Sequence, residues 1–324
     1  MIKEQFENIL FNTSFASSTY SSKEIKAISD FTIFFQYDFN NILDYDQMAP
    51  HHDRDLWKHT ATVMSGIPIF GKKYNLTKTE EELLTIVGFF HDFGKPNTMT
   101  EKKYDKVPLL PDNHPSRRFQ TPTEDGLSTV TLHSFMGHAA ESSRLASFYL
   151  DMLGYPRETS KLIKFYIAHH DDYMRIRDIN KESISNMAEI TLKLIQDAQK
   201  TEFPLDVRAI QLLMLIGKCD AAAQATYIYE FNKDTNSFPP ISEPSDTLTR
   251  KIETYEDIEI HFPDVLNATD KLIVEEYQKA IAAGEPNATD LYGNQRNLLR
   301  TIQEGFRGMR DQSMDLSDEG PSFE

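Results

Sequence analysis

The stretch TEEELLTIVGFFHDFGKPNT, residues 79–98, joins an apolar helical pattern to an adjacent histidine and aspartate. Thr79 and Glu82 have the spacing of a capping box, which marks a helix start. Apolar or aromatic positions then recur at i, i+4, i+7 and i+8, namely Leu83, Val87, Phe90 and His91. This spacing predicts a helix that buries one face.

The same stretch also predicts where that helix ends. Gly94 is expected to close it in the left-handed conformation, and Pro96 prevents its continuation. His91 and Asp92 would then lie in the last turn of a buried helix. A rigid scaffold would hold both side chains toward one cavity.

Most of the remaining chain also has helical spacing, and strand signals are sparse. We expect further helices over 138–153, 158–171, 182–200, 205–230, 245–260, 268–284 and 288–309. Residues 97–132 are rich in Pro, Asp, Thr and Ser without a sustained period, which predicts a long loop of the kind that forms lids. The predicted fold class is all-α, a helical bundle with an additional C-terminal helical region.

The domain organisation follows from proline and charge patterns. The stretch SFPPISEPSD, residues 237–246, is the best candidate boundary. We expect an N-terminal helical extension over 1–50, the main helical domain over 51–236 and a C-terminal helical region over 237–310. Residues 311–324, DQSMDLSDEGPSFE, are polar and aperiodic, which predicts a disordered acidic tail.

Composition limits the possible partners. The chain has 34 basic and 50 acidic residues, a formal net charge of −16, which argues against a surface that grips long nucleic acid. A small anionic substrate, or a nucleic-acid end held locally, fits better. A single cysteine, Cys219, and the lack of a run of about 18 apolar residues predict a cytoplasmic protein that does not enter a membrane.

Histidines and aspartates on the predicted helices form an inventory of metal ligands. Together, neutral imidazole and carboxylate suit a divalent first-row metal. A single histidine on an apolar helix is more often a hydrogen-bonded core residue. Asp220 is harder to explain in that way, because LLMLIGKCDAAAQA is apolar around it and a buried carboxylate must be paired or coordinated. The candidate ligands are His59, His91, Asp92, His138, His169, His170 and Asp220.

The ordered segments DLWKHT, FFHDFGKPNTMT, SFMGHAAESS, IAHH and CDAAAQ resemble the HD superfamily of metal-dependent phosphohydrolases, which are all-helical enzymes. They are most similar to the HD domain of bacterial CCA-adding tRNA nucleotidyltransferases, over about residues 53–226. Such enzymes carry a nucleotidyltransferase head before this domain. Only about 50 residues precede His51, too few for that head, so we do not expect CCA addition.

The resemblance implies a set of roles for the candidate ligands. His59, His91, Asp92 and Asp220 would hold one divalent ion, and Asp92 would also bridge to a second. His138 and His169 would complete the second site, with His170 as an open alternative. The cofactor would be one or two ions of Mn, Ni, Co, Fe, Mg or Zn, and Asp92 and Lys95 would act in catalysis.

Basic residues near these motifs are candidate substrate contacts. Lys95 would place its ammonium on a phosphate oxygen or, equally, cap the end of the helix. Arg117, Arg118 and Arg175 would clamp a phosphate, although a solvated basic pair is the more common explanation. Arg177 shares this ambiguity, and His51 and His52 are expected to be loop residues. We expect His114, His133 and His261 to be structural or exposed. Asp171 and Asp172 are expected to orient the neighbouring histidines.

The resulting functional hypothesis is a metal-dependent phosphohydrolase that cleaves phosphate esters of a nucleotide or an RNA 3′ end, of the 2′,3′-cyclic phosphodiesterase and phosphatase type. A second enzymatic alternative is a nucleotidase or a deoxynucleoside triphosphate triphosphohydrolase. An alternative of another class is a non-catalytic HD binding or regulatory module, which should lack ligands that this sequence retains.

Overall fold

The computed structural model describes residues 1–15, 20–49, 55–174, 176, 178–224, 227–242, 245–246 and 248–315. Over these ranges the fold is mostly α-helical, with a three-stranded and a two-stranded antiparallel sheet, which confirms the predicted predominance of helices. None of the helices in the described ranges has both the length and the apolar character needed to cross a membrane.

The chain divides into two compact units. The first comprises residues 1–171 and 215–253, and the second comprises residues 172–214 and 254–324. This division differs from the boundaries predicted from the sequence. Residues 1–50 belong to the first unit, and the C-terminal helices share a unit with residues 172–214, because packing rather than chain order defines a unit.

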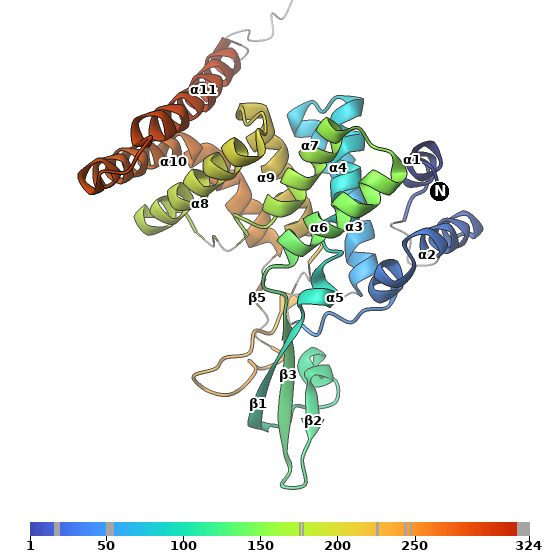
Figure 1. The fold of residues 1–324 in the computed structure, drawn as a ribbon. Helices are drawn as coiled ribbons and strands as arrows, with labels where there is room; N and C mark the ends of the chain where they lie inside the picture. The colour runs from blue at the N-terminus through green and yellow to red at the C-terminus, as the bar shows by residue number, and fades with distance from the viewer. Residues whose placement is uncertain are drawn as a thin grey trace, which may run out of the picture. The chain divides into compact units, whose positions relative to one another are not determined.

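Helices form most of the first unit (Figure 1). Within it α3 packs against α4, α4 against α7, and α6 against α7, while α1 and α2 contact α4 and α3. The helices are α1 (Lys3–Asn12), α2 (Ser22–Leu43), α3 (Leu56–Gly71), α4 (Lys78–Phe90), α5 (Lys95–Thr98), α6 (His138–Leu153), α7 (Arg157–His169) and the last part of α9 (Val207–Ala222), with short 3₁₀ turns at Lys72–Tyr74 and Pro115–Phe119.

Aromatic side chains form the centre of this unit. Eight of them are at most 2% exposed and pack against one another, mostly edge-to-face or tilted: Phe6, Phe31, Phe35, Phe39, Trp57, Phe89, Phe90 and Phe93. One of them lies on α1, three lie on α2, and two lie on α4. The N-terminal helices α1 and α2 therefore complete the core under the end of α4. They fix the position from which His91 and Asp92 extend.

The start of α4 differs by two residues from the sequence prediction. The N-cap is Thr77, whose side chain accepts from the Glu80 backbone N–H while Glu80 bonds back to the Thr77 backbone. The predicted cap at Thr79 is therefore wrong. The run T-K-T-E-E-E offers two overlapping capping boxes, and the preceding turn, where Asn75 is left-handed, selects the first.

The role predicted for Gly94 is also wrong. Its backbone is right-handed, with φ −80° and ψ −10°, and it leads directly into the short helix α5. Its small size matters instead. A Cβ at this position would lie 2.5 Å from the Ser142 backbone nitrogen and 2.6 Å from the His138 carbonyl oxygen of α6. Glycine allows the segment after α4 to touch α6, and the Gly94 N–H donates to Ser142 Oγ at 2.8 Å.

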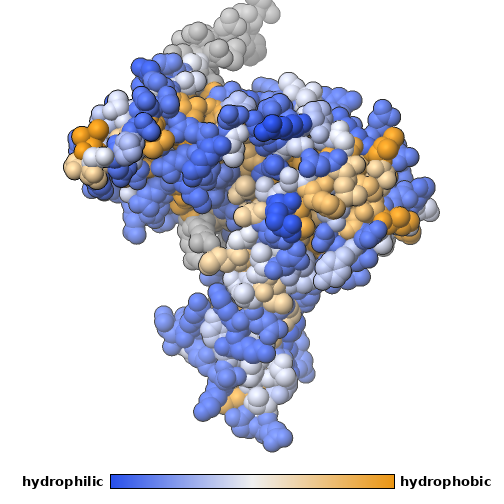
Figure 2. All heavy atoms as spheres, viewed as in Figure 1, coloured by the Kyte–Doolittle hydropathy of each residue, from blue (hydrophilic) through white to orange (hydrophobic). Residues whose placement is uncertain are grey.

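A sheet replaces most of the long loop predicted over residues 97–132. Strands β1 (Thr100–Pro108), β2 (Gln120–Pro122) and β3 (Leu127–Ser134) pair antiparallel in the order β1-β3-β2. In this unit the sheet extends away from the helices (Figure 1). Most of β1 is exposed and charged, and the face seen in Figure 2 is largely hydrophilic. The apolar alternation that marks a half-buried strand is therefore weak in the sequence.

The sheet has a small core of its own. Val107, Phe119 and Val130 pack together with Phe238, a residue far along the chain. Because one of the four comes from a distant segment, the local sequence did not indicate this core. Farther along the chain, β4 (Tyr227–Ile228) pairs antiparallel with β5 (Ser245–Asp246). The helix predicted over 205–230 therefore ends earlier than expected, at Ala222.

The second unit contains α8 (Lys181–Thr201), most of α10 (Leu248–Ala283) and α11 (Ala288–Asp315). Two helices predicted over 245–260 and 268–284 form one helix, which continues through Pro263. Phe262, Val265 and Leu266 around that proline are at most 1% exposed, and their burial offsets the lost backbone hydrogen bond. Residues 311–315, predicted as disordered tail, belong to α11.

Candidate metal centre

Five separate segments bring six histidine and aspartate side chains together, five of them buried and His138 half-buried. His59 lies on α3, whose N-cap Asp55 accepts from the Lys58 backbone N–H. His91 and Asp92 follow the end of α4, and Asp220 lies on α9. His138 is the first residue of α6, and His170 directly follows α7. All six residues lie in the first unit.

The first group of ligand atoms surrounds Oδ2 of Asp92 and Oδ1 of Asp220. The His59 Nε2 atom lies 3.2 Å from Asp92 Oδ2 and 3.0 Å from Asp220 Oδ1. The His91 Nε2 atom lies 3.2 Å from Asp92 Oδ2, 4.0 Å from Asp220 Oδ1 and 3.3 Å from His59 Nε2. His59, His91 and Asp92 are at most 1% exposed, so these atoms are shielded from bulk solvent.

The second group faces the other oxygen of each carboxylate. The His138 Nε2 atom lies 3.3 Å from Asp92 Oδ1, and the His170 Nε2 atom lies 3.8 Å from Asp220 Oδ2 and 3.9 Å from Asp92 Oδ1. The two Nε2 atoms of His138 and His170 are 3.4 Å apart. The His138 side chain is 13% exposed, against 8% or less for the other five, so the cluster is most open at His138.

Each of the four histidines turns its Nδ1 atom away from the cluster. The partners of Nδ1 are backbone carbonyl oxygens: Ala223 for His59 at 3.3 Å, Gly88 for His91 at 2.7 Å, Phe135 for His138 at 2.9 Å and Ile167 for His170 at 2.8 Å. A carbonyl only accepts, so Nδ1 carries the proton in every case. The neutral ring then offers an Nε2 lone pair to the centre, as a metal ligand does.

Burial and charge oppose each other in the pKa values of this cluster. Burial by itself lowers the pKa of His59, but hydrogen bonds to Asp220 and Asp92 outweigh it and raise that pKa to about 9. Burial also lowers the pKa of His138, so this imidazole is neutral at pH 7. For Asp220, burial raises the pKa, but hydrogen bonding and charge from His59 outweigh it and hold the pKa well below its usual range. The pKa of Asp92 is likewise held well below its usual range, against the effect of burial, by charge from His91 and Lys95, so both carboxylates are ionised.

The donor set fits a divalent metal ion. Two overlapping groups have ligand atoms within 4.8 Å of one another, His59 with His91 and Asp220, and His91 with Asp92 and His170. Within the described residues, Oδ1 of Asp92 faces His138 Nε2 at 3.3 Å and Oδ1 of Asp220 faces His59 Nε2 at 3.0 Å, and neither buried oxygen has a hydrogen bond while the facing ring is neutral. Imidazole nitrogens and carboxylate oxygens suit first-row divalent ions, whose charge would satisfy these oxygens.

Metal binding should release a proton from His59. At pH 7 a His59 with a pKa of about 9 is protonated in the metal-free protein, and only its neutral form can bind a metal through Nε2. We expect the affinity for Mn²⁺ to rise about tenfold per pH unit from pH 7 until it levels off near pH 9. Calorimetric titration of Mn²⁺ in buffers of different ionisation enthalpy measures the number of protons released per metal ion bound. An affinity that stays flat over this range would contradict the assignment of His59.

His170 rather than His169 belongs to the cluster. The groups of close ligand atoms found in the described residues include His170 and leave out His169, whose ring lies 4.5 Å from that of Phe165 on the same helix. Asp171 Oδ2 lies 3.9 Å from His138 Nε2, and its charge raises the pKa of His138 against the larger, opposite effect of burial. Helical phase separates the two histidines, since neighbouring positions differ by about 100° around the axis.

The arginines predicted as phosphate clamps have protein partners elsewhere. Arg117 pairs with Asp112 at 3.4 Å and donates to the Gln120 carbonyl at 3.0 Å. Arg118 lies 3.3 Å from Asp46 and stacks on Phe119 at 4.6 Å. These contacts order the region between β1 and β2. Residues Arg175, Arg177, His51 and His52 lie outside the described part of the chain.

The other predicted residues have varied surroundings. His114 Nε2 lies 3.0 Å from the Pro239 carbonyl, which agrees with a structural role. His261 Nδ1 lies 3.5 Å from the exposed Asp264. Lys95 is 5% exposed, and its Nζ atom lies 2.7 Å from Asp92 Oδ2, so its ammonium joins the cluster. This position agrees with its predicted place at the site rather than with a helix cap at the surface.

Gln47 is a member of this neighbourhood that sequence reasoning missed. Its side chain is fully buried, and its Oε1 atom accepts from Lys95 Nζ at 2.8 Å. Gln47 belongs to an irregular segment 48 residues before Lys95, and nothing in YDQMAP marks it. Only the folded chain brings the two together.

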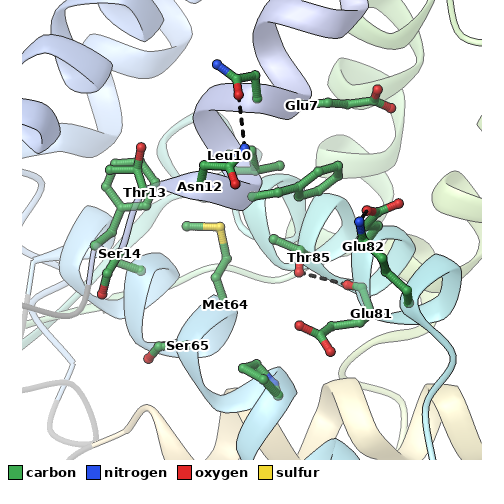
Figure 3. Close-up of a pocket in the computed structure, with 16 residues that line it drawn as sticks. Glu7, Leu10, Asn12, Thr13, Ser14, Met64, Ser65, Glu81, Glu82 and Thr85 are labelled. Carbon is green, nitrogen blue, oxygen red and sulfur yellow. Dashed lines mark hydrogen bonds and ion pairs between the residues drawn. The ribbon is translucent and has the colours of Figure 1, made fainter.

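A pocket of about 690 Å³ opens elsewhere in the first unit, between α1, α3 and α4 (Figure 3). Apolar residues such as Leu10 and Met64 line it, and Glu7, Glu81 and Glu82 stand around it. None of the candidate ligands lines this pocket. Three glutamates and one lysine, Lys78, stand in its wall, so the net charge there is negative and disfavours a phosphate substrate.

Comparison with known proteins gives no family assignment: no protein-family model matches the chain, and a search of curated proteins finds no match.

Proposed function

We propose that this chain is an HD-type metal-dependent phosphohydrolase that cleaves phosphate esters of a nucleotide or an RNA 3′ end. One observation carries the proposal. Asp92 directs Oδ2 toward His59 and His91 and Oδ1 toward His138, so a single carboxylate serves two groups of nitrogen ligands. A carboxylate shared by two such groups would suit the paired metal ions of a two-metal phosphohydrolase.

The chain's own residues would divide the work as follows. His59, His91, Asp92 and Asp220 would hold one ion, and His138, His170 and the second oxygen of Asp92 would hold another. Bound divalent ions lower the pKa of water and stabilise charge on phosphoryl oxygens during in-line displacement. The substrate would approach from the more open side at His138, which faces Oδ1 of Asp92, while Lys95 supplies a buried positive charge at Oδ2 of the same carboxylate. The net charge of −16 favours a small substrate over an extended nucleic acid.

Hydrolysis assays test this proposal directly. The panel contains 2′,3′-cyclic nucleotides, nucleoside monophosphates and deoxynucleoside triphosphates, each with Mn²⁺, Ni²⁺, Co²⁺ or Mg²⁺ and with EDTA. We expect metal-dependent turnover of the cyclic nucleotides that EDTA abolishes. Preference for monophosphates or triphosphates would instead favour the nucleotidase or triphosphohydrolase alternative. Metal binding without turnover of any member would favour the non-catalytic module, and absence of metal binding would sink the proposal.

A further inference from the structure

A second polar cluster adjoins the candidate metal centre. The segment around Gln47 is fixed by backbone hydrogen bonds on two sides: the Leu56 N–H donates to the Tyr45 carbonyl at 3.0 Å, and the His133 N–H donates to the Met48 carbonyl at 2.9 Å. It therefore lies between the start of α3, which carries His59, and the end of β3, which leads to His138. Gln47 is held where both segments converge on the site.

The contacts of Lys95 fix the orientation of the Gln47 amide. An ammonium group only donates hydrogen bonds, so the atom 2.8 Å from Lys95 Nζ must be the amide oxygen. The same ammonium lies 2.7 Å from Asp92 Oδ2 and 5.6 Å from the centre of the Phe135 ring. The Phe135 carbonyl in turn accepts from His138 Nδ1. Gln47 is thus joined through Lys95 to Oδ2 of the bridging carboxylate, and Phe135 lies between Lys95 and His138.

The remaining donor of that amide has no acceptor. Gln47 Nε2 is buried and makes no hydrogen bond within the described part of the chain. The hydroxyl of Tyr45 and Nδ1 of His133 are buried without a partner there as well, and the two rings are 6.4 Å apart. Buried polar groups are rarely left unsatisfied, and exceptions often mark a place where a ligand supplies the missing partner. An amide N–H₂ beside an ammonium calls for an anionic acceptor.

We propose that Gln47 is a substrate-binding residue, whose Nε2 donates to a non-bridging oxygen of the phosphoryl group that the Lys95 ammonium also contacts. This inference rests on the proposed function, since it takes the anion to be the phosphoryl group of the ester. It adds a neutral donor to the ammonium, so that the two contact different oxygens of one phosphate.

Phosphate binding by the full-length chain tests the inference without turnover. Gln47→Met keeps the size of the side chain and removes both polar atoms. Inorganic phosphate is titrated into the Mn²⁺-saturated wild type, Gln47→Met, Lys95→Met and the double variant, with thermal unfolding and Mn²⁺ stoichiometry measured for each. Gln295→Met is the matched control, because Gln295 is 2% exposed and lies on α11 in the second unit.

The double variant separates direct binding from an effect through Lys95. We expect Gln47→Met to weaken phosphate binding about tenfold, the size of a hydrogen bond to a charged group, both in the wild type and in the Lys95→Met background. Gln295→Met should leave the affinity unchanged. If Gln47→Met has no effect once Lys95 is methionine, Gln47 only positions Lys95 and the inference is wrong. Failure of the Mn²⁺-loaded wild type to bind phosphate would also overturn it.

The two proposals fail in different ways. Metal-dependent hydrolysis together with a phosphate affinity that Gln47→Met does not change would support the proposed function and contradict this inference. Phosphate binding that depends on Gln47, without hydrolysis of any ester, would leave the anion site standing and remove the hydrolase proposal.

Discussion

Asp92→Asn is expected, under the proposed function, to lower kcat/KM for the hydrolysed ester by about 1,000-fold, because charge stabilisation by two metal ions would contribute several kcal/mol and each 1.36 kcal/mol is a factor of ten. Both carboxylate oxygens face histidine Nε2 atoms within 3.3 Å. An amide keeps the shape but loses the negative charge and one acceptor oxygen. We expect Mn²⁺ stoichiometry and affinity to fall together with activity.

The same substitution should also destabilise the metal-free protein. Burial opposes ionisation of Asp92, but charges on His91 and Lys95 outweigh it and hold the pKa of Asp92 well below its usual range. Asparagine would remove the Asp92 carboxylate from beside the buried Lys95 ammonium, a change that costs about 3–5 kcal/mol in buried ion pairs. Urea unfolding in EDTA measures this loss of stability. Measuring the folded fraction of the variant at the assay temperature with saturating metal shows whether activity falls by more than the folded fraction does.

Two neighbouring histidines supply the matched comparison. His170→Gln should reduce metal binding and activity, because His170 Nε2 faces His138 and both carboxylates. His169→Gln, which alters the ring packed on Phe165, should retain Mn²⁺ stoichiometry. The opposite result for this pair, or an active Asp92→Asn variant, would show that the cluster is not the catalytic centre.

Gly94→Ala should destabilise the protein by about 3 kcal/mol or more and impair metal binding, because the new methyl group meets backbone rather than flexible side chains. The nearest atoms, at 2.5 and 2.6 Å, are the Ser142 nitrogen and the His138 carbonyl oxygen. Relief requires α6 to shift away from Gly94, and α6 begins with His138. The substitution should therefore disturb the second group of ligands while leaving every ligand residue in place.

Gly293→Ala is the matched control for this prediction. Gly293 lies in α11, and a Cβ there would have no neighbour within 4 Å. Alanine should stabilise that helix by roughly 0.5–1 kcal/mol. Urea unfolding of both variants, with Mn²⁺ titration, gives the comparison. A Gly94→Ala variant as stable as the wild type would mean that α6 and the end of α4 do not approach as described.

Local sequence was a good guide to the helices. The period of apolar residues located α4, α6, α7 and α8 to within two residues, because their buried faces repeat every three or four positions. It failed where distant segments decide the outcome. Strand β1 is mostly exposed, and the small core of its sheet includes the distant Phe238, so the local sequence has no alternating apolar pattern that would predict the strand. Packing around Pro263 likewise joined two predicted helices into one.

For the candidate site, the sequence by itself determined which residue types could serve as ligands, because histidine and aspartate within apolar helical segments need a partner when buried. Tertiary structure alone decided which atoms meet. It selected His170 over His169, divided the Asp92 oxygens between two groups, paired Arg117 and Arg118 with other residues and brought Gln47 to Lys95. The physical reason is that a ligand's type is a local property, whereas the direction of its side chain depends on how helices far apart in sequence pack against one another.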